Sequence, residues 1–115
     1  MGGQVKPDKV LQMLGLAQRA GAVGSGGFMT ETSVKDGKAF LVVVAKDASD
    51  NTRKDFKNMC EYYNVPIRSY GNREELGHCI GKEFRASLAV TDEGLAKKIL
   101  SLIDSDEAVR KDEVL

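Results

Sequence analysis

The chain of 115 residues has no long hydrophobic run, few cysteines and a formal net charge of zero. No apolar stretch approaches the ~18 to 20 residues that a helix needs to cross a bilayer, and the first residues lack the charged-then-apolar layout of a signal peptide. We therefore expect a cytoplasmic protein that makes no membrane contact. The length suits one domain with its own core and is too short for two.

The sequence also lacks the residue groups of a metal or catalytic centre. Its two cysteines, Cys60 and Cys79, do not have metal-ligand spacing, and in a reducing compartment they are interpreted as small buried hydrophobes. The single histidine, His78, points away from its neighbour Cys79 on a helix, so we interpret it as a surface or capping residue. Because no paired carboxylates and no activated nucleophile emerge, we expect no metal, no cofactor and no enzymatic activity.

The zero net charge argues against a protein that binds nucleic acid mainly through a large overall positive charge. The charge is uneven, however. Residues 1–90 contain 13 Lys and Arg against 10 Asp and Glu, whereas residues 91–115 contain 4 against 7, so the two parts carry +3 and −3. This allows a local anionic partner without requiring one. We place a single domain at residues 1–103 and interpret 104–115 as an acidic tail or a frayed helix extension.

What the sequence does contain is one buried strand. Seven apolar residues follow one another at 39–45, three of them consecutive valines, which suits a strand covered on both faces. The polar cluster that begins at Ser49 can then cap a helix over about 50–64. The rest of the chain is expected to pack against this strand.

Predicted helices and strands alternate along the chain. Alternation of this kind predicts a three-layer α/β/α sandwich with a mixed central sheet of about four strands, in which the strand at 39–45 is central. The segments that can be placed are helices at about 7–20, 28–36 and 50–64, and strands at 39–45, 65–70 and 87–91. Two further helices follow: one starts at Asn72, which has capping-box-like spacing with Glu75, and the other starts at Thr91 or Asp92.

Residues 21–27 carry four glycines in seven positions and leave three interpretations open. The segment can be a turn that leads into the second helix. It can be a loop that approaches a nucleic-acid backbone closely, where missing side chains are useful. A phosphate-cradling nucleotide site is the weakest interpretation, because a helix precedes the glycines instead of a strand and no Gly-Lys-Ser/Thr follows.

Residues 82–86 read Lys-Glu-Phe-Arg-Ala, one aromatic flanked by two cations. This connection can be a hinge of ordinary polarity. It can also be a platform on which Phe84 meets an unstacked base while Lys82 and Arg85 meet phosphate.

Several segments occur together in a recognisable order between about residues 6 and 103. They are Leu-Gly-Leu-Ala-Gln-Arg-Ala-Gly at 14–21, Gly-Lys-Ala at 37–39, Leu-Val-Val-Val-Ala-Lys-Asp-Ala-Ser-Asp-Asn-Thr at 41–52, Val-Pro at 65–66, Leu-Gly at 76–77, Ile-Gly-Lys at 80–82 and, after Arg85, Leu-Ala-Val-Thr-Asp at 88–92. Together these pieces resemble the kink-turn RNA-binding ribosomal-protein superfamily, in particular its small bacterial members.

The resemblance implies a non-enzymatic domain that holds sharply bent RNA between the start of its second helix and the loop before its last strand. In that family a Gly-x-Asn-Glu-x-x-Lys signature opens the second helix and reads sheared G·A pairs. Counting back from Gly37, those positions here are Gly26, Phe28, Met29 and Thr32, so only the glycine is retained.

The implied partner is a structured RNA, ribosomal or otherwise containing a kink-turn, with the ribosome as one setting and the protein as a monomer. The residues expected at the RNA are Gly26, Gly27, Phe28, Met29, Thr32, Lys38, Lys46, Gly81, Lys82, Phe84 and Arg85. A second hypothesis is a paralogue that keeps the fold but acts through protein contacts or on a different RNA, since Phe28 and Met29 cannot exchange hydrogen bonds with base edges.

Overall fold

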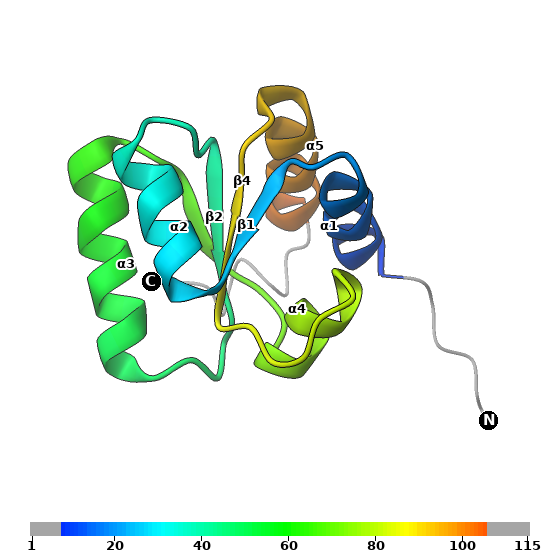
Figure 1. The fold of residues 1–115 in the computed structure, drawn as a ribbon, viewed down its shortest axis with the longest axis horizontal. Helices are drawn as coiled ribbons and strands as arrows, with labels where there is room; N and C mark the ends of the chain where they lie inside the picture. Colours follow the sequence, from blue (N-terminus) through cyan, green and yellow to red (C-terminus); the bar gives the residue numbers. More distant parts are fainter. Residues whose placement is uncertain (1–7, 106–115) are drawn as a thin grey trace.

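The computed structural model describes residues 8–105, which fold into five helices around one four-stranded sheet (Figure 1). In chain order the elements are α1 (Lys9–Arg19), β1 (Val23–Ser25), α2 (Gly26–Lys35), β2 (Leu41–Val44), α3 (Asp50–Tyr63), β3 (Ile67–Ser69), α4 (Arg73–Cys79), β4 (Ser87–Val90) and α5 (Glu93–Asp104). The tail expected at 104–115 lies outside the described residues from 106 onward, and Asp104 is the last residue of α5. None of the helices within 8–105 has both the length and the hydropathy of a membrane span.

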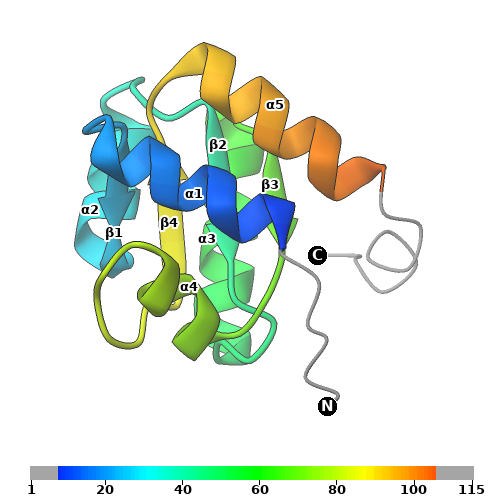
Figure 2. The same ribbon diagram turned by 90° about the vertical axis from the view of Figure 1, so that its right-hand side faces the viewer.

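The sheet has the strand order β1-β4-β2-β3. β2 pairs in parallel with β3 and antiparallel with β4, and β1 pairs antiparallel with β4. Helices α2 and α3 cover one face of the sheet, while α1, α4 and α5 cover the other, as the two perpendicular views show (Figures 1 and 2). The predicted three-layer α/β/α sandwich with a mixed sheet of four strands is therefore confirmed.

The core forms on both faces of the two inner strands. Every residue of β2 is fully buried, as is every residue of β4, because successive side chains of a strand point into opposite helical layers. The predicted central position of the apolar run at 39–45 is thus confirmed. The helices supply the other large buried side chains, which include Leu14, Val34, Phe56, Leu76, Ile99 and Ile103.

Side chains cap the starts of four of the five helices. The acceptors are Asp8 for α1, Ser49 for α3, Asn72 for α4 and Asp92 for α5. The predicted caps at Ser49 and Asp92 and the capping box between Asn72 and Glu75 are confirmed. Among the helices of residues 8–105, α2 alone begins without a side-chain cap, so its first backbone N–H groups have no such acceptor.

The glycine-rich segment differs from the expected turn, because Val23–Ser25 forms strand β1. Its pairing with β4 places Gly24 opposite Ala89, and α2 begins at Gly26, earlier than the expected residue 28. A Cβ atom at Gly24 would lie 2.9 Å from the Oγ of Ser33, so α2 packs directly on this strand. Three residues with a central glycine are too few to show the alternation of apolar and polar residues that predicts a strand. The strand forms because β4 pairs with it.

Candidate nucleic-acid interface

The sheet brings the ends of several strands to one edge of the molecule. Ser25 at the end of β1 pairs with Leu88, and Val44 at the end of β2 pairs with Ser87. Since β4 runs antiparallel to both strands, the loop that precedes it lies beside the start of α2 and the residue that follows β2, at the bottom of Figure 1. We call this surface the strand-end edge; it consists of residues 26–29, Lys46 and the loop 80–86.

The start of α2 presents unoccupied hydrogen-bond donors on the strand-end edge. Ser25 stands at the N-cap position, but its Oγ accepts a hydrogen bond from Nε of Arg85 at 3.3 Å and caps no backbone N–H group. Gly26 has a φ of 88°, which favours glycine, and the first turn contains no acidic residue. The positive end of the helix dipole and its free N–H groups therefore form a site that suits an anionic oxygen.

The loop 80–86 is fixed against α4 at both ends. The N–H of Lys82 donates to the carbonyl of Gly77 at 2.8 Å, and the N–H of Arg85 donates to the carbonyl of Arg73 at 3.0 Å. A Cβ atom at Gly77 would lie 1.2 Å from the carbonyl oxygen of Glu83, so the loop crosses α4 where only glycine leaves room. The loop is thus held in place before any ligand arrives.

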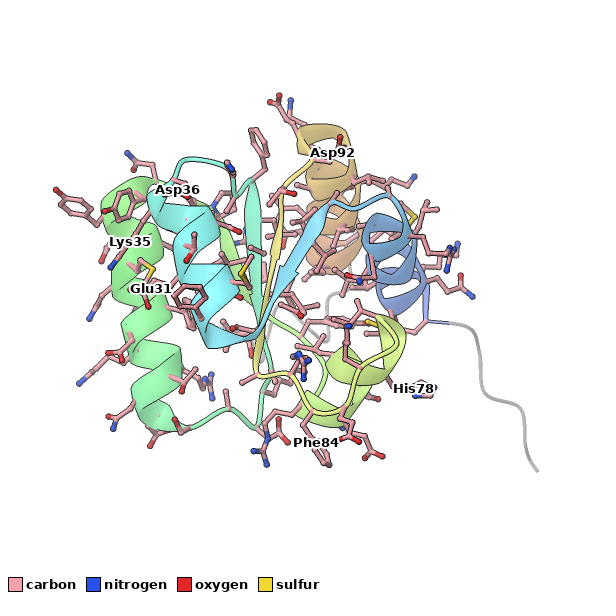
Figure 3. The ribbon with its side chains drawn as sticks, viewed as in Figure 1. Glu31, Lys35, Asp36, His78, Phe84 and Asp92 are labelled. Carbon is pink, nitrogen blue, oxygen red and sulfur yellow. The ribbon has the colours of Figure 1, made fainter. Side chains whose placement is uncertain are left out.

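Phe84 stands at the tip of this loop with 63% of its surface exposed (Figure 3). The guanidinium of Arg73 lies 6.0 Å from the ring centroid, within the range of a cation–π contact. Asp47 holds Arg73 in turn, accepting its backbone N–H at 2.8 Å and its Nε at 3.4 Å. The ring is therefore supported by a positioned cation and still offers most of its surface to the solvent.

Two further apolar side chains are exposed on the first turn of α2. Phe28 is 79% exposed and Met29 is 47% exposed. With Phe84 they make up three of the seven large hydrophobic side chains that are exposed within residues 8–105. Single exposed hydrophobics are ordinary, but several on one edge beside cations indicate a binding surface.

Of the other residues predicted to contact RNA, some lie on the strand-end edge and some lie away from it. Lys46 is exposed directly after β2, with its N–H bonded to the carbonyl of Gly71, and Gly81 and Lys82 are exposed where the loop leaves α4. Thr32 is half-buried farther along α2. Lys38 follows the C-terminal end of α2, whose ten residues extend ~15 Å from the strand-end edge, so the structure does not bring Lys38 to this surface.

Three residues that support the strand-end edge could not be predicted from the sequence. Ser25, Asp47 and Arg73 take part through contacts with partners 60 and 26 positions away in the chain. Local patterns carry no signal for such pairs. The one available clue was Asp47, a carboxylate beside the predicted site residue Lys46 at the end of a buried strand.

The cysteines and the histidine take no part in this surface. Cys60 is buried and Cys79 half-buried, and burial raises the pKa of each thiol to about 11, so both are protonated at neutral pH. His78 is exposed on α4, as predicted (Figure 3). Within the part of the chain that the structure describes, no three His, Cys, Asp or Glu side chains are grouped so that they could hold a metal ion.

Comparison with solved structures supports the fold. The structure of a protein with unknown function from Bacillus halodurans C is 37% identical with a TM-score of 0.83, and the match covers 85% of this chain and 99% of that one. A 15.5kD RNA binding protein of Giardia lamblia has a TM-score of 0.72 at 20% identity, over 94% of this chain and 96% of that one. The second match concerns the fold alone.

Sequence comparison identifies the family. RNA-binding protein YlxQ of Bacillus subtilis is 45% identical over 92 residues, which cover 80% of this chain and 92% of that protein. YlxQ of Enterococcus faecium is 38% identical over 84% of this chain and 92% of its own, and the large ribosomal subunit protein eL30 of Spodoptera frugiperda is 30% identical over 85% and 88%. A family model matches residues 8–100, and the chain belongs to the ribosomal protein L7Ae/L30e/S12e/Gadd45 family.

Proposed function

We propose that this protein is a non-enzymatic RNA-binding protein that holds a structured RNA on its strand-end edge. The observation that carries the proposal is the juxtaposition of the uncapped start of α2 with Arg85 and, in the same loop, the exposed ring of Phe84. Backbone N–H groups and guanidinium groups bind phosphate oxygens, and an exposed aromatic ring stacks on an unpaired base. Two bacterial relatives are named RNA-binding proteins, which agrees with this assignment.

The RNA that suits this edge best is a sharply bent one of the kink-turn kind. Gly26 and Arg85 belong to different elements, yet the position of a Cβ atom at Gly26 is 4.0 Å from Cδ of Arg85. A bend brings two stretches of RNA backbone close together, so both elements can be contacted at once. We propose that five residues face the RNA backbone: Gly26, Gly27, Lys46, Lys82 and Arg85. The proposed ligands include kink-turns of ribosomal RNA.

A calorimetric or gel-shift titration tests this proposal. The ligands are an RNA that contains a kink-turn and a matched RNA in which Watson–Crick pairs replace the G·A pairs. We expect the kink-turn RNA to bind more tightly, with an affinity that falls as the salt concentration rises, because phosphate contacts release counterions. Absence of binding to either RNA at low salt would overturn the proposal of a kink-turn RNA.

The exposure of Phe28 and Met29 supports a second candidate function. These side chains occupy the positions at which the kink-turn superfamily carries Asn and Glu, and both are open to the solvent. Apolar groups there suit an unstacked base or a protein better than the edges of G·A pairs. This candidate is a paralogue that binds a different RNA or a protein.

The two candidates make different predictions for one double variant. If Phe28 and Met29 prevent recognition of the G·A pairs of a kink-turn, the wild type binds both matched RNAs equally. The double variant Phe28→Asn with Met29→Glu then has a higher affinity for the kink-turn RNA alone. If the wild type already prefers the kink-turn RNA, the first candidate holds. A double variant with no gain shows that these two side chains are not the cause of a lost preference.

A further inference from the structure

Asp47 lies where three segments of the chain meet at the strand-end edge. The chain before it is fixed by backbone hydrogen bonds, because the N–H of Ala45 donates to the carbonyl of Ala86 at 2.9 Å. The N–H of Lys46 donates to the carbonyl of Gly71 at 2.8 Å. The segment after β2 is thus bonded both to the end of the loop 80–86 and to the segment before α4, and Asp47 follows directly.

The carboxylate of Asp47 holds Arg73 at two points. Oδ1 accepts the backbone N–H at 2.8 Å, and Oδ2 accepts Nε at 3.4 Å. Arg73 is the first residue of α4, so its N–H is one that the helix itself leaves without an acceptor. The side chains are 48% exposed for Asp47 and 52% exposed for Arg73, so the ion pair alone adds little to the free energy of unfolding. Its main effect is to orient the guanidinium.

Arg73 in turn contacts two neighbouring residues of the loop 80–86. Its guanidinium carbon lies 6.0 Å from the centroid of the Phe84 ring, and its carbonyl accepts the N–H of Arg85 at 3.0 Å. Nη1 of Arg85 also donates to the carbonyl of Phe84 at 2.9 Å, so the two loop residues are joined to each other. The ring and the guanidinium that are proposed to contact RNA are therefore both placed by Arg73.

The guanidinium of Arg73 differs from the other cations of this surface, because it has a carboxylate partner. Within residues 8–105, Lys46, Lys82 and Arg85 form no salt bridge. A phosphate that approached Arg73 would compete with Asp47 and would be repelled by its negative charge. Phosphate therefore binds more readily at the three unpaired cations than at Arg73.

We propose that Asp47 and Arg73 are positioning residues for the loop 80–86, and that the guanidinium of Arg73 contacts no phosphate. The pair keeps Phe84 and Arg85 in the arrangement that binds RNA. This inference rests on the proposed RNA binding at the strand-end edge. It distinguishes two kinds of cation on one surface, because only a residue that contacts phosphate contributes to the salt dependence of binding.

The first test is a titration of the full chain with a kink-turn RNA at several salt concentrations. Arg73→Gln removes the cation beside the Phe84 ring and should weaken binding about threefold. The slope of log affinity against log salt should remain that of the wild type, because no phosphate contact is lost. A slope that becomes shallower by about one unit would show that Arg73 contacts phosphate and would overturn the proposal. An unchanged affinity would overturn it as well.

Asp47→Asn tests the role of the carboxylate. The amide keeps an oxygen that can accept the N–H of Arg73, but it lacks the charge that holds the guanidinium. We expect the released guanidinium to contact phosphate, so the salt slope should become steeper by about one unit. The control Asp50→Asn removes an exposed carboxylate that forms no salt bridge within residues 8–105, and it should leave the slope unchanged. Equal slopes in the two variants would contradict the proposal.

A double-mutant cycle tests whether the side chain of Arg73 acts through Phe84. In the Phe84→Ala protein, Arg73→Gln should change the RNA affinity by less than about twofold, because the ring that Arg73 supports is absent. The full loss of about threefold in that protein would show that Arg73 acts independently of the ring, and the proposal would fail. Urea denaturation checks that each variant is folded.

The proposed function and this inference can fail separately. If the wild type does not bind the kink-turn RNA, both are removed together. If the wild type binds and any of the contrary results is found in the variants, the positioning role alone is removed and the RNA-binding surface remains.

Discussion

The Nε of Arg85 donates a hydrogen bond to the Oγ of Ser25 at 3.3 Å, which joins two residues 60 positions apart in the chain. The hydroxyl is the N-cap group of α2, and in this bond it faces the loop instead of the helix. One arginine therefore connects the two elements of the strand-end edge and stands beside the free N–H groups of the helix. If RNA binds there, Arg85 is the side chain whose loss should matter most.

Replacing Arg85 with alanine should weaken RNA binding by 1–3 kcal/mol, roughly 5- to 150-fold. The slope of log affinity against log salt should become shallower by about one unit, because one phosphate contact is lost. Ser25→Ala keeps the guanidinium of Arg85 and should therefore reduce the RNA affinity less than Arg85→Ala does. Titrations at two or more salt concentrations measure both effects, and an unchanged salt slope for Arg85→Ala would contradict a phosphate contact.

Phe84→Ala should reduce RNA affinity by about 1–3 kcal/mol through the loss of base stacking. Because the ring is 63% exposed, the melting temperature should hardly change. The control is Tyr62→Ala. Tyr62 is 79% exposed near the end of α3 that lies away from the strand-end edge, and its removal should leave RNA affinity intact. Equal losses in both variants would show that the effect is not local.

Gly77→Ala should disturb the loop 80–86, because the added methyl group would stand 1.2 Å from the carbonyl oxygen of Glu83. We expect a loss of unfolding free energy of about 2 kcal/mol or more, together with weaker RNA binding. Gly94→Ala is the matched control in the first turn of α5, where the new Cβ atom would be 3.5 Å from Oδ2 of Asp92, an ordinary contact. Urea denaturation should show this control unchanged or stabilised by ~0.5–1 kcal/mol. A Gly77→Ala protein as stable as the control would contradict the close contact between Gly77 and the loop 80–86.

The buried thiols predict a loss of stability in alkaline solution. Burial raises the pKa of Cys60 and of Cys79 from 9.0 to about 11, so between these values the unfolded chain releases protons that the folded chain keeps. The unfolding free energy should therefore fall as the pH rises from 9 to 11, by an amount on the order of 2 kcal/mol for Cys60.

The alanine variants of both cysteines test this pH dependence. Lysine and tyrosine side chains also titrate in this range, so the informative quantity is the difference in pH slope between the wild type and the double variant. We expect the double variant to have the shallower slope. Identical slopes from pH 9 to pH 11 would show that the thiols do not contribute.

The sequence predicts the parts of this fold that depend on neighbours in the chain. The apolar run at 39–45, the cap at Ser49 and the capping box at Asn72 are all visible as local patterns, and all three are confirmed. Strand β1 is not visible, because Val-Gly-Ser becomes a strand only through its pairing with β4. The same limit applies to the site: Phe84 and Arg85 stand out locally, whereas their partners Arg73 and Ser25 are brought to them by the sheet.

The most direct test of the account is a ¹⁵N NMR titration of the full chain with a kink-turn RNA at low salt. If the strand-end edge binds RNA, the amide signals of Gly26, Gly27, Phe84 and Arg85 should shift most, while those of Phe40 and Tyr62 at the opposite end should not. The Arg85→Ala protein should show smaller shifts at the same RNA concentration. No binding at low salt, or the largest shifts at Phe40 and Tyr62, would contradict the account.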